Sequence, residues 1–156
     1  SSSANKAGQA GVPLFQAHLA GAAQSYQNRI HHYKNAGYDA GFADEELPVG
    51  TGGLMYLAES TEEAFRTAYP HFNAGFQLTN GQDFPKRAFA QGISPKSVTL
   101  IGDPKLVTEK IIYQYDLFKQ QRFTVECDFG GLPLEEVKRT LEVFAEEVIP
   151  KVKQHI

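Results

Sequence analysis

Three groups of side chains in this sequence are of types that carry chemistry in proteins. The first is the run Ser1, Ser2 and Ser3, which opens the chain and precedes a stretch able to form a short helix ending at Gly11. Such a segment can bind phosphate through its hydroxyls and through the free backbone N–H groups at a helix start. A small, polar terminus is also typical of a disordered end. Composition alone favours that second interpretation.

The histidines and the single cysteine form the other two groups. His18 lies near the end of a predicted strand, where polar side chains suit a ligand pocket; a hydrogen-bonded structural histidine is the alternative. His31 and His32 are adjacent on a predicted helix and point about 100° apart, so the pair cannot chelate one ion. We therefore predict no metal site. Cys127 falls inside a predicted strand, which favours a buried apolar thiol over a nucleophile.

Composition limits the kinds of partner that the protein can bind. The 156 residues are enough for a single domain, residues 1–156, and 42% of them are hydrophobic. A net charge of -3 gives no basic surface for nucleic acid or for an anionic membrane. No apolar run approaches the roughly 20 residues of a membrane span, and the start of the chain lacks a signal peptide's apolar region. One cysteine excludes a disulfide framework, so we expect a cytoplasmic protein without nucleic-acid or membrane partners.

The clearest element is a strand followed by a helix near the end of the chain. Residues 122–128 alternate, with Phe123, Val125 and Cys127 on one face and the polar residues on the other. Gly130 and Gly131 then interrupt the extended backbone, and a helix is predicted from residue 134. Its apolar stripe consists of Leu134, Val137, Leu141, Phe144 and Val148.

Two further strands are predicted at residues 13–19 and 49–58. In the first, Leu14, Gln16 and His18 share one face, which we interpret as the inner, ligand-facing one. A helix over residues 22–36 follows this strand and is expected to stop at Gly37.

The second strand is followed by a helix with Ser60 as its N-cap, in a capping box with Glu63. Pro70 predicts a kink or a break in that helix. Residues 78–96 are predicted to be irregular, and Asp103 is predicted to cap a further helix that begins at Pro104.

Three strands, each followed by a helix, predict a parallel α/β fold. No phosphate-binding glycine motif of the P-loop or Rossmann type is present. A complete (β/α)8 barrel needs about 250 residues, so three units make a partial (β/α)8 barrel. Such a sheet has open edges and an uncovered face, which predicts a homo-oligomer, most simply a dimer. The alternative is that residues 78–96 fold back over the uncovered face.

A family resemblance is carried by short motifs that follow one another along the chain. Residues 101–107 (IGDPKLV), with Lys110 and Ile111 after them, resemble the pattern (V/I)G(D/S)P…V…KI of luciferase-like flavin-dependent monooxygenases. Residues 10–15 (AGVPLF) resemble the strand entry that this family writes as GLP. The remaining matches are residues 116–118 (DLF), 122–123 (RF), 128–133 (DFGGLP) and 147–150 (EVIP).

The resemblance implies a (β/α)8 TIM barrel that binds FMN at the carboxyl ends of its strands, with this chain supplying about three C-terminal βα units. It implies that Ser1, Ser2 and Ser3 contact the FMN phosphate and that His18 lies near the flavin. The first five units, which carry the catalytic side chains known in the family, have no counterpart here.

Two functions follow as expectations. The first is an FMN-dependent monooxygenase that uses O2 and reduced flavin supplied by a flavin reductase, with the isolated chain inactive. The second is a non-catalytic, flavin-binding or self-assembling partial barrel.

Overall fold

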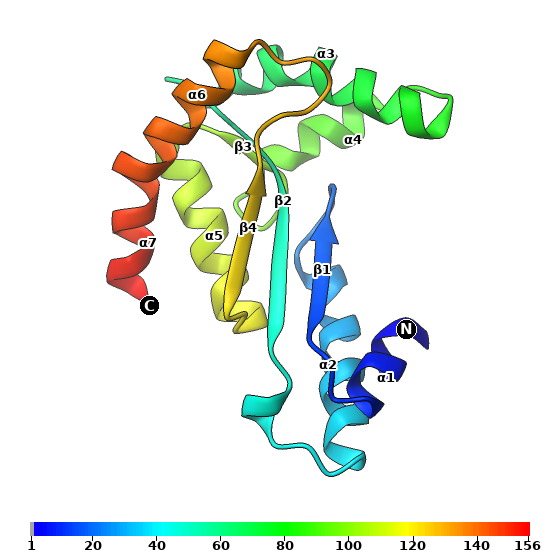
Figure 1. Ribbon diagram of the computed structural model, residues 1–156. Coiled ribbons are helices and arrows are strands. Elements are labelled where there is room, and N and C mark those ends of the chain that lie inside the picture. The colour runs from blue at the N-terminus through cyan, green and yellow to red at the C-terminus, as the bar shows by residue number, and fades with distance from the viewer. Residues whose placement is uncertain (1) are drawn as a thin grey trace.

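The computed structural model describes residues 2–156, and it is a mixed α/β fold around a parallel sheet (Figure 1). The longest strand, β2 (Val49–Leu57), lies at the centre of the sheet. It pairs in parallel with β1 (Leu14–His18) and with β4 (Arg122–Glu126). Its last three residues pair with β3 (Leu100–Gly102). The parallel α/β prediction is therefore confirmed, with one short strand, β3, beyond the three expected.

The helices follow the strands in the expected order. They are α1 (Ser2–Gln9), α2 (Gln24–Asp39), α3 (Thr61–Asn80), α4 (Lys86–Ala90), α5 (Pro104–Phe118), α6 (Leu134–Val143) and α7 (Ile149–His155). Two of the predicted caps are present. The Ser60 hydroxyl accepts a hydrogen bond from the Glu63 N–H at 3.2 Å, and the Asp103 carboxylate accepts one from the Leu106 N–H at 2.8 Å. Satisfying free N–H groups in this way fixes where α3 and α5 begin.

Two helix predictions are wrong, and a third is wrong in part. Helix α2 does not stop at Gly37 but continues to Asp39, and Gly37 is needed because an added Cβ would lie 2.4 Å from Leu47. Helix α3 is not broken at Pro70, which lies inside it, and a kink there stays a prediction. Residues 78–96 are not irregular throughout, since they contain the end of α3, all of α4 and the 3-10 turn η2 (Gln91–Ile93). In each case packing of the helix against its neighbours outweighs the local breaking signal.

The two faces of the sheet differ in their cover. Helices α2 and α5 pack on one face, burying Gln16, His18, Thr51 and Met55. The opposite face is exposed around Phe15, and we call it the open face. Its residues are Phe15, Ala17, Leu19, Gly50, Gly52, Leu54, Arg122, Thr124 and Glu126.

The interpretation of Leu14, Gln16 and His18 as the inner face is wrong, because these side chains point towards the helices. The predicted alternation of residues 122–128 is confirmed. Phe123, Val125 and Cys127 are at least partly buried on the helix side, while Thr124 and Glu126 are exposed. Residues 78–96 do not provide a cover for the open face either. Phe84 and Phe89 from that segment instead pack against Phe72 of α3. Helix α4, which carries Phe89, lies beyond the carboxyl ends of the strands (Figure 1).

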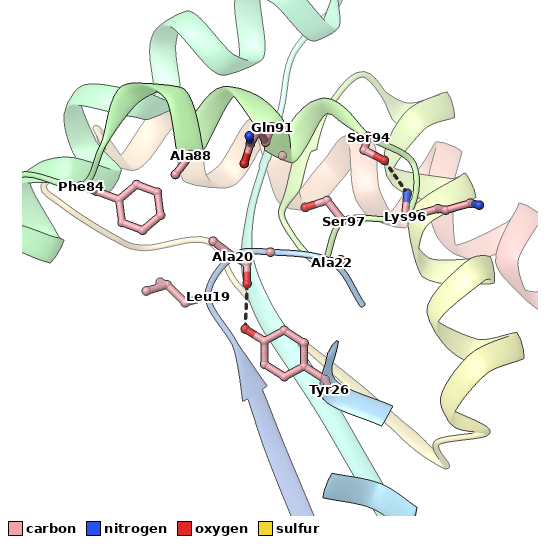
Figure 2. Close-up of a pocket in the computed structure, with 12 residues that line it drawn as sticks. Leu19, Ala20, Ala22, Tyr26, Phe84, Ala88, Gln91, Ser94, Lys96 and Ser97 are labelled. Carbon is pink, nitrogen blue, oxygen red and sulfur yellow. Dashed lines mark hydrogen bonds between the residues drawn. The ribbon is translucent and has the colours of Figure 1, made fainter. Parts of the chain in front are cut away.

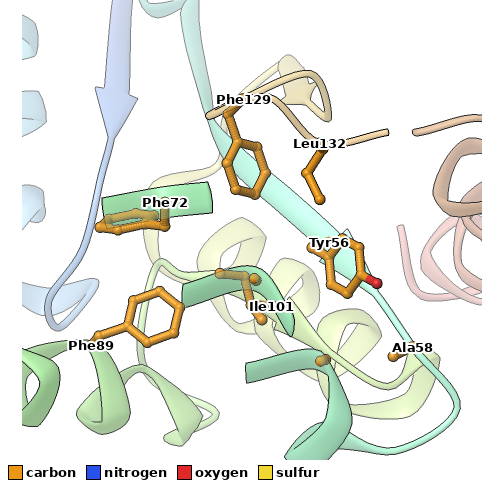
Figure 3. Close-up of a cluster of buried hydrophobic side chains, with 9 residues drawn as sticks. Tyr56, Ala58, Phe72, Phe89, Ile101, Phe129 and Leu132 are labelled. Carbon is orange, nitrogen blue, oxygen red and sulfur yellow. The ribbon is translucent and has the colours of Figure 1, made fainter. Parts of the chain in front are cut away.

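One of the three apolar clusters holds α3 and α4 against the ends of β2 and β3. Phe72 of α3 lies at its centre, with the rings of Phe84 and Phe89 both 5.0 Å away between centroids. Tyr56 and Ile101 contribute from the strands, and Phe129 and Leu132 enter from the loop after β4 (Figure 3). This cluster therefore holds α3, α4 and the loop after β4 together beyond the carboxyl ends of the strands.

The predicted stripe of the last helix is only partly buried. Val148 is fully buried and Val137 and Phe144 are half-buried, but Leu134 and Leu141 are 64% and 45% exposed. A π-helical turn, η3 (Phe144–Val148), lies between α6 and α7. A π turn inserts an extra residue per turn, so a face drawn with one constant period across both helices cannot stay on the core.

The glycine pair after β4 gives a test of local packing. Both residues have positive φ, 57° at Gly130 and 71° at Gly131, so each alanine variant should lose about 1 kcal/mol from backbone strain. An added Cβ at Gly130 would in addition overlap the His71 carbonyl oxygen, whereas that at Gly131 would meet nothing within 4 Å. We expect Gly130→Ala to lower the free energy of unfolding by a further 1–3 kcal/mol or so. Urea melts of the two variants check this, and equal losses would contradict it.

Neither membrane spans nor metal clusters are found in residues 2–156. No helix there is long and apolar enough to cross a bilayer. No three His, Cys, Asp or Glu side chains in this range lie close enough together to hold an ion. His31 and His32 are both exposed on α2.

Candidate functional site

The carboxyl ends of β1, β2 and β4 lie at the same edge of the sheet, because the three strands are parallel. A pocket of about 520 Å³ opens beside the end of β1. One wall is the turn at residues 19–22 with Tyr26 of α2, and the other is formed by Phe84, α4 and the segment 91–97 (Figure 2). Ligands of open α/β sheets bind at this edge. The pocket is therefore the candidate site.

Backbone hydrogen bonds hold the two walls together. The Ala23 N–H donates to the Lys96 carbonyl, and the Val98 N–H donates to the Gly21 carbonyl, both at 2.9 Å. The Tyr26 hydroxyl donates to the Ala20 carbonyl at 2.8 Å (Figure 2). These contacts fix the turn after β1 before any ligand binds, which lowers the entropy cost of binding.

The surface of the pocket is mainly apolar, with a few polar groups at its rim. Leu19, Phe84 and Ala88 provide apolar area, while Gln91 and Ser94 are exposed. An apolar slot with few polar groups suits a flat, largely apolar ring system bearing polar edges.

A buried lysine lies behind the 91–97 wall. Lys110 of α5 has no exposed surface, and its Nζ donates to the carbonyls of Gly92 and Thr99, the latter at 2.6 Å. Its Nζ also lies 5.7 Å from the centre of the Phe65 ring. Burial lowers the pKa of Lys110 to about 7, because removing the ammonium from water penalises its charged form. The amine ties the pocket wall to α5 and does not reach the pocket surface.

The serines and His18 lie apart from one another. Ser1 is outside the described residues. Ser2 and Ser3 are exposed at the start of α1, which is helical, so the interpretation as a disordered end is wrong for the described part of this segment. Helix α1 runs antiparallel to β1, and its N-terminus therefore points towards the edge where the strands end (Figure 1). Contact of these serines with a phosphate stays a prediction.

His18 is buried between the sheet and the helices. Its Nδ1 is 3.3 Å from Oε1 of Gln114, and its ring centre lies 4.3 Å from that of Tyr26 and 5.4 Å from that of Phe118. Burial lowers the pKa of His18 to about 4, so the ring is neutral at pH 7. A contact between His18 and a flavin remains a prediction, and its ring points away from the open face.

His18 is one of five buried polar side chains, which we call the polar layer. The other four are Gln16, Thr51, Gln114 and Gln120, and each of the five is at most 6% exposed. Each carries one buried polar atom without a hydrogen-bond partner among the described residues. The alternation of polar residues in β1 is the signal of this layer, but alternation marks a face without saying what covers it.

Cys127 is a buried thiol, as predicted. It follows β4 directly and is 6% exposed, within the apolar cluster that contains Met55 and Val107. Burial, followed by the nearby charge of Glu126, raises the pKa of the thiol to about 11. A thiol that stays protonated at neutral pH is a poor nucleophile.

Comparison with solved structures identifies the fold. Monooxygenase RslO1 from Streptomyces bottropensis superimposes with a TM-score of 0.67 at 25% identity, over 96% of this chain and 44% of that one. The oxygenating constituent of 3,6-diketocamphane monooxygenase from Pseudomonas putida, solved with FMN, gives 0.65 at 21% identity, over 96% and 45%. The chain has a luciferase-like fold.

A further matched structure was solved with F420 in place of FMN. An F420-dependent secondary alcohol dehydrogenase gives a TM-score of 0.62 at 18% identity, over 97% of this chain and 46% of that one. This chain thus spans less than half the length of the luciferase-like structures it matches. No protein-family model matches the sequence, and no curated protein does.

Proposed function

We propose that this chain is the C-terminal portion of an FMN-dependent, luciferase-like monooxygenase, and that its sheet is part of a (β/α)8 barrel. The main support is one arrangement: parallel strands whose carboxyl ends meet beside a preformed, mostly apolar pocket. The likeness to a monooxygenase solved with FMN supports the same cofactor. A flavin reductase would supply the reduced flavin.

The proposal assigns the two ends of FMN to two parts of the chain. Helix α1 has no acidic residue in its first turn, and Ser2 and Ser3 expose hydroxyls there, so a phosphate would meet hydroxyls and free N–H groups. The ring system would lie in the pocket after β1, against Leu19 and Phe84. Bound FMN, when reduced, supplies the electrons for activating O2. The chain's own contribution is to hold the phosphate, orient the ring and keep water from it.

Titration with FMN, followed by flavin fluorescence, tests the cofactor site. We expect the wild-type chain to bind FMN and Ser3→Ala to bind at least about tenfold more weakly, since a hydrogen bond to a charged group contributes roughly 1.5–3 kcal/mol. Thr79→Ala is the matched control, because the Thr79 hydroxyl is exposed at the far end of α3 and bonds only to carbonyls of its own helix and to Asn80. Identical curves for wild type and Ser3→Ala would discard the phosphate site.

The second candidate function is a non-catalytic partial barrel that binds flavin or assembles with itself. The exposed open face favours it, with Phe15 54% and Leu19 42% exposed. Oxygen uptake with chemically reduced FMN tests whether the isolated chain is catalytic. We expect no uptake above that of free reduced FMN, because the 156 residues span under half of the matched barrels. Substrate-dependent uptake would show that the chain alone is a complete enzyme.

A further inference from the structure

The open face of the sheet carries an ordered pattern of side chains. Strand register aligns Phe15 with Gly50 and Gly50 with Arg122, forming one row across the three strands. A second row joins Ala17, Gly52 and Thr124, and a third contains Leu54 and Glu126, with Leu19 just past the end of β1. Since residues two apart along a strand lie about 6.6 Å from each other, the face is a regular grid.

Each strand gives this grid a different character. Strand β1 is apolar and exposed through Phe15 and Leu19. The surface over β2 is recessed because Gly50 and Gly52 lack side chains. The Phe15 ring extends over Gly50, where an added Cβ would lie 2.9 Å from the ring. A groove of about 340 Å³ follows this line between Phe15 and Thr124.

Strand β4 carries opposite charges at its two ends, Arg122 and Glu126. Both side chains are exposed, and within residues 2–156 neither forms an ion pair. Arg122 and Glu126 lie four residues apart on the same face, with Thr124 between them.

Resting on the second candidate function, in which the chain acts alone as a partial barrel, we propose that two copies of this chain pair through their open faces, with their strands antiparallel, so that Arg122 of each lies against Glu126 of the other. A two-fold axis that crosses the strands at the middle row lays β4 on β4 with its ends exchanged. The same axis lays β1 on β1, so that Phe15 meets Leu19 of the second copy. Each of these charges then meets its opposite, Phe15 and Leu19 meet each other, and Leu54 lies over Gly50 of the second copy.

The other face-to-face two-fold, with its axis along the strands, is disfavoured by the same grid. It would place Arg122 against Phe15 and Glu126 against Leu19 of the second copy. Glu126 would then lose water without gaining a partner, which is costly for a carboxylate. The charge pattern thus selects the antiparallel arrangement.

Charge reversal on β4 provides the test, with mass measured by light scattering after size-exclusion chromatography. We expect wild type to be a dimer in the micromolar range. Arg122→Glu and Glu126→Arg should each raise the dimer dissociation constant at least about 100-fold, because like charges would face each other twice. An equimolar mixture of the two variants should recover a dimer, since each contact in the mixed pair again joins opposite charges.

Matched variants separate this interface from general effects of charge. Lys138→Glu changes an exposed side chain on the outer surface of α6 and should leave the dimer intact. Thr124→Arg, which would bring two arginines together at the middle row, should give a folded monomer by circular dichroism even if one charge-reversal variant fails to fold. A wild-type monomer at high micromolar concentration, single variants that dimerise like wild type, or a mixture that stays monomeric would each overturn the proposal.

Discussion

Raising the pH from 7 to 9 should increase the free energy of unfolding by about 2 kcal/mol, and Lys110→Met should remove this increase. In the folded protein, burial lowers the pKa of Lys110 from 10.5 to about 7. Between these values the unfolded chain binds more protons than the folded one. Stability therefore rises with pH across this window, as the unfavourable buried charge disappears.

Urea melts at pH 7 and pH 9 measure the effect. The upper limit is chosen because the pKa of Cys127 rises from 9.0 to about 11 on folding, which makes stability fall with pH above 9. His18, with its pKa lowered to about 4, titrates below the window. Lys105→Met is the matched control, since Lys105 is exposed on the same helix. The same pH dependence in wild type and Lys110→Met would show that Lys110 titrates normally.

Phe72→Ala should lower the free energy of unfolding by about 3–5 kcal/mol, as is usual for truncating a buried phenylalanine. Phe72 is 2% exposed and contacts the rings of Phe84 and Phe89, so its loss leaves a cavity between α3 and the segment that carries α4. Leu78→Ala, on the same helix but 89% exposed, should change stability by no more than roughly 0.5 kcal/mol. Equal losses in denaturant melts would mean that α3 packs through a different face.

Local chemical signals predicted the fold well. The caps at Ser60 and Asp103 and the alternation in residues 122–128 each depend on neighbouring residues alone, and each is present. Gly37 and Pro70 failed as breakers because distant contacts stabilise their helices. The π turn at Phe144–Val148 likewise has no local signal, and Leu134 and Leu141 before it are exposed.

The candidate site was harder to predict because alternation does not say which face of a strand is covered. The alternation in residues 13–19 predicts that Gln16 and His18 face a ligand, yet both side chains lie under the helices. Lys110 had a signal that was missed. It lies three residues after Val107 and next to Ile111, inside the buried stripe of α5, and Gln114 continues the same stripe. A polar residue within an apolar helical stripe indicates a buried polar contact.

The proposed cofactor pocket and the proposed dimer interface share one residue, Leu19, which lines the pocket and borders the open face. Their tests are nevertheless independent. Ser3 lies on α1, whereas Arg122 and Glu126 lie on β4. Loss of FMN binding in Ser3→Ala with an unchanged mass would support the cofactor site alone, and loss of the dimer with unchanged FMN binding would support the interface alone.

The single buried thiol can report local opening of this molecule. Cys127 is the only cysteine in the chain and is buried directly after β4, in the cluster that contains Met55, Val107 and Val148. A thiol reagent can modify it only while this cluster is open, and the high thiol pKa slows the reaction further at neutral pH. Each modification event therefore records one opening, and its rate reports how often the strand separates from the helices that cover it.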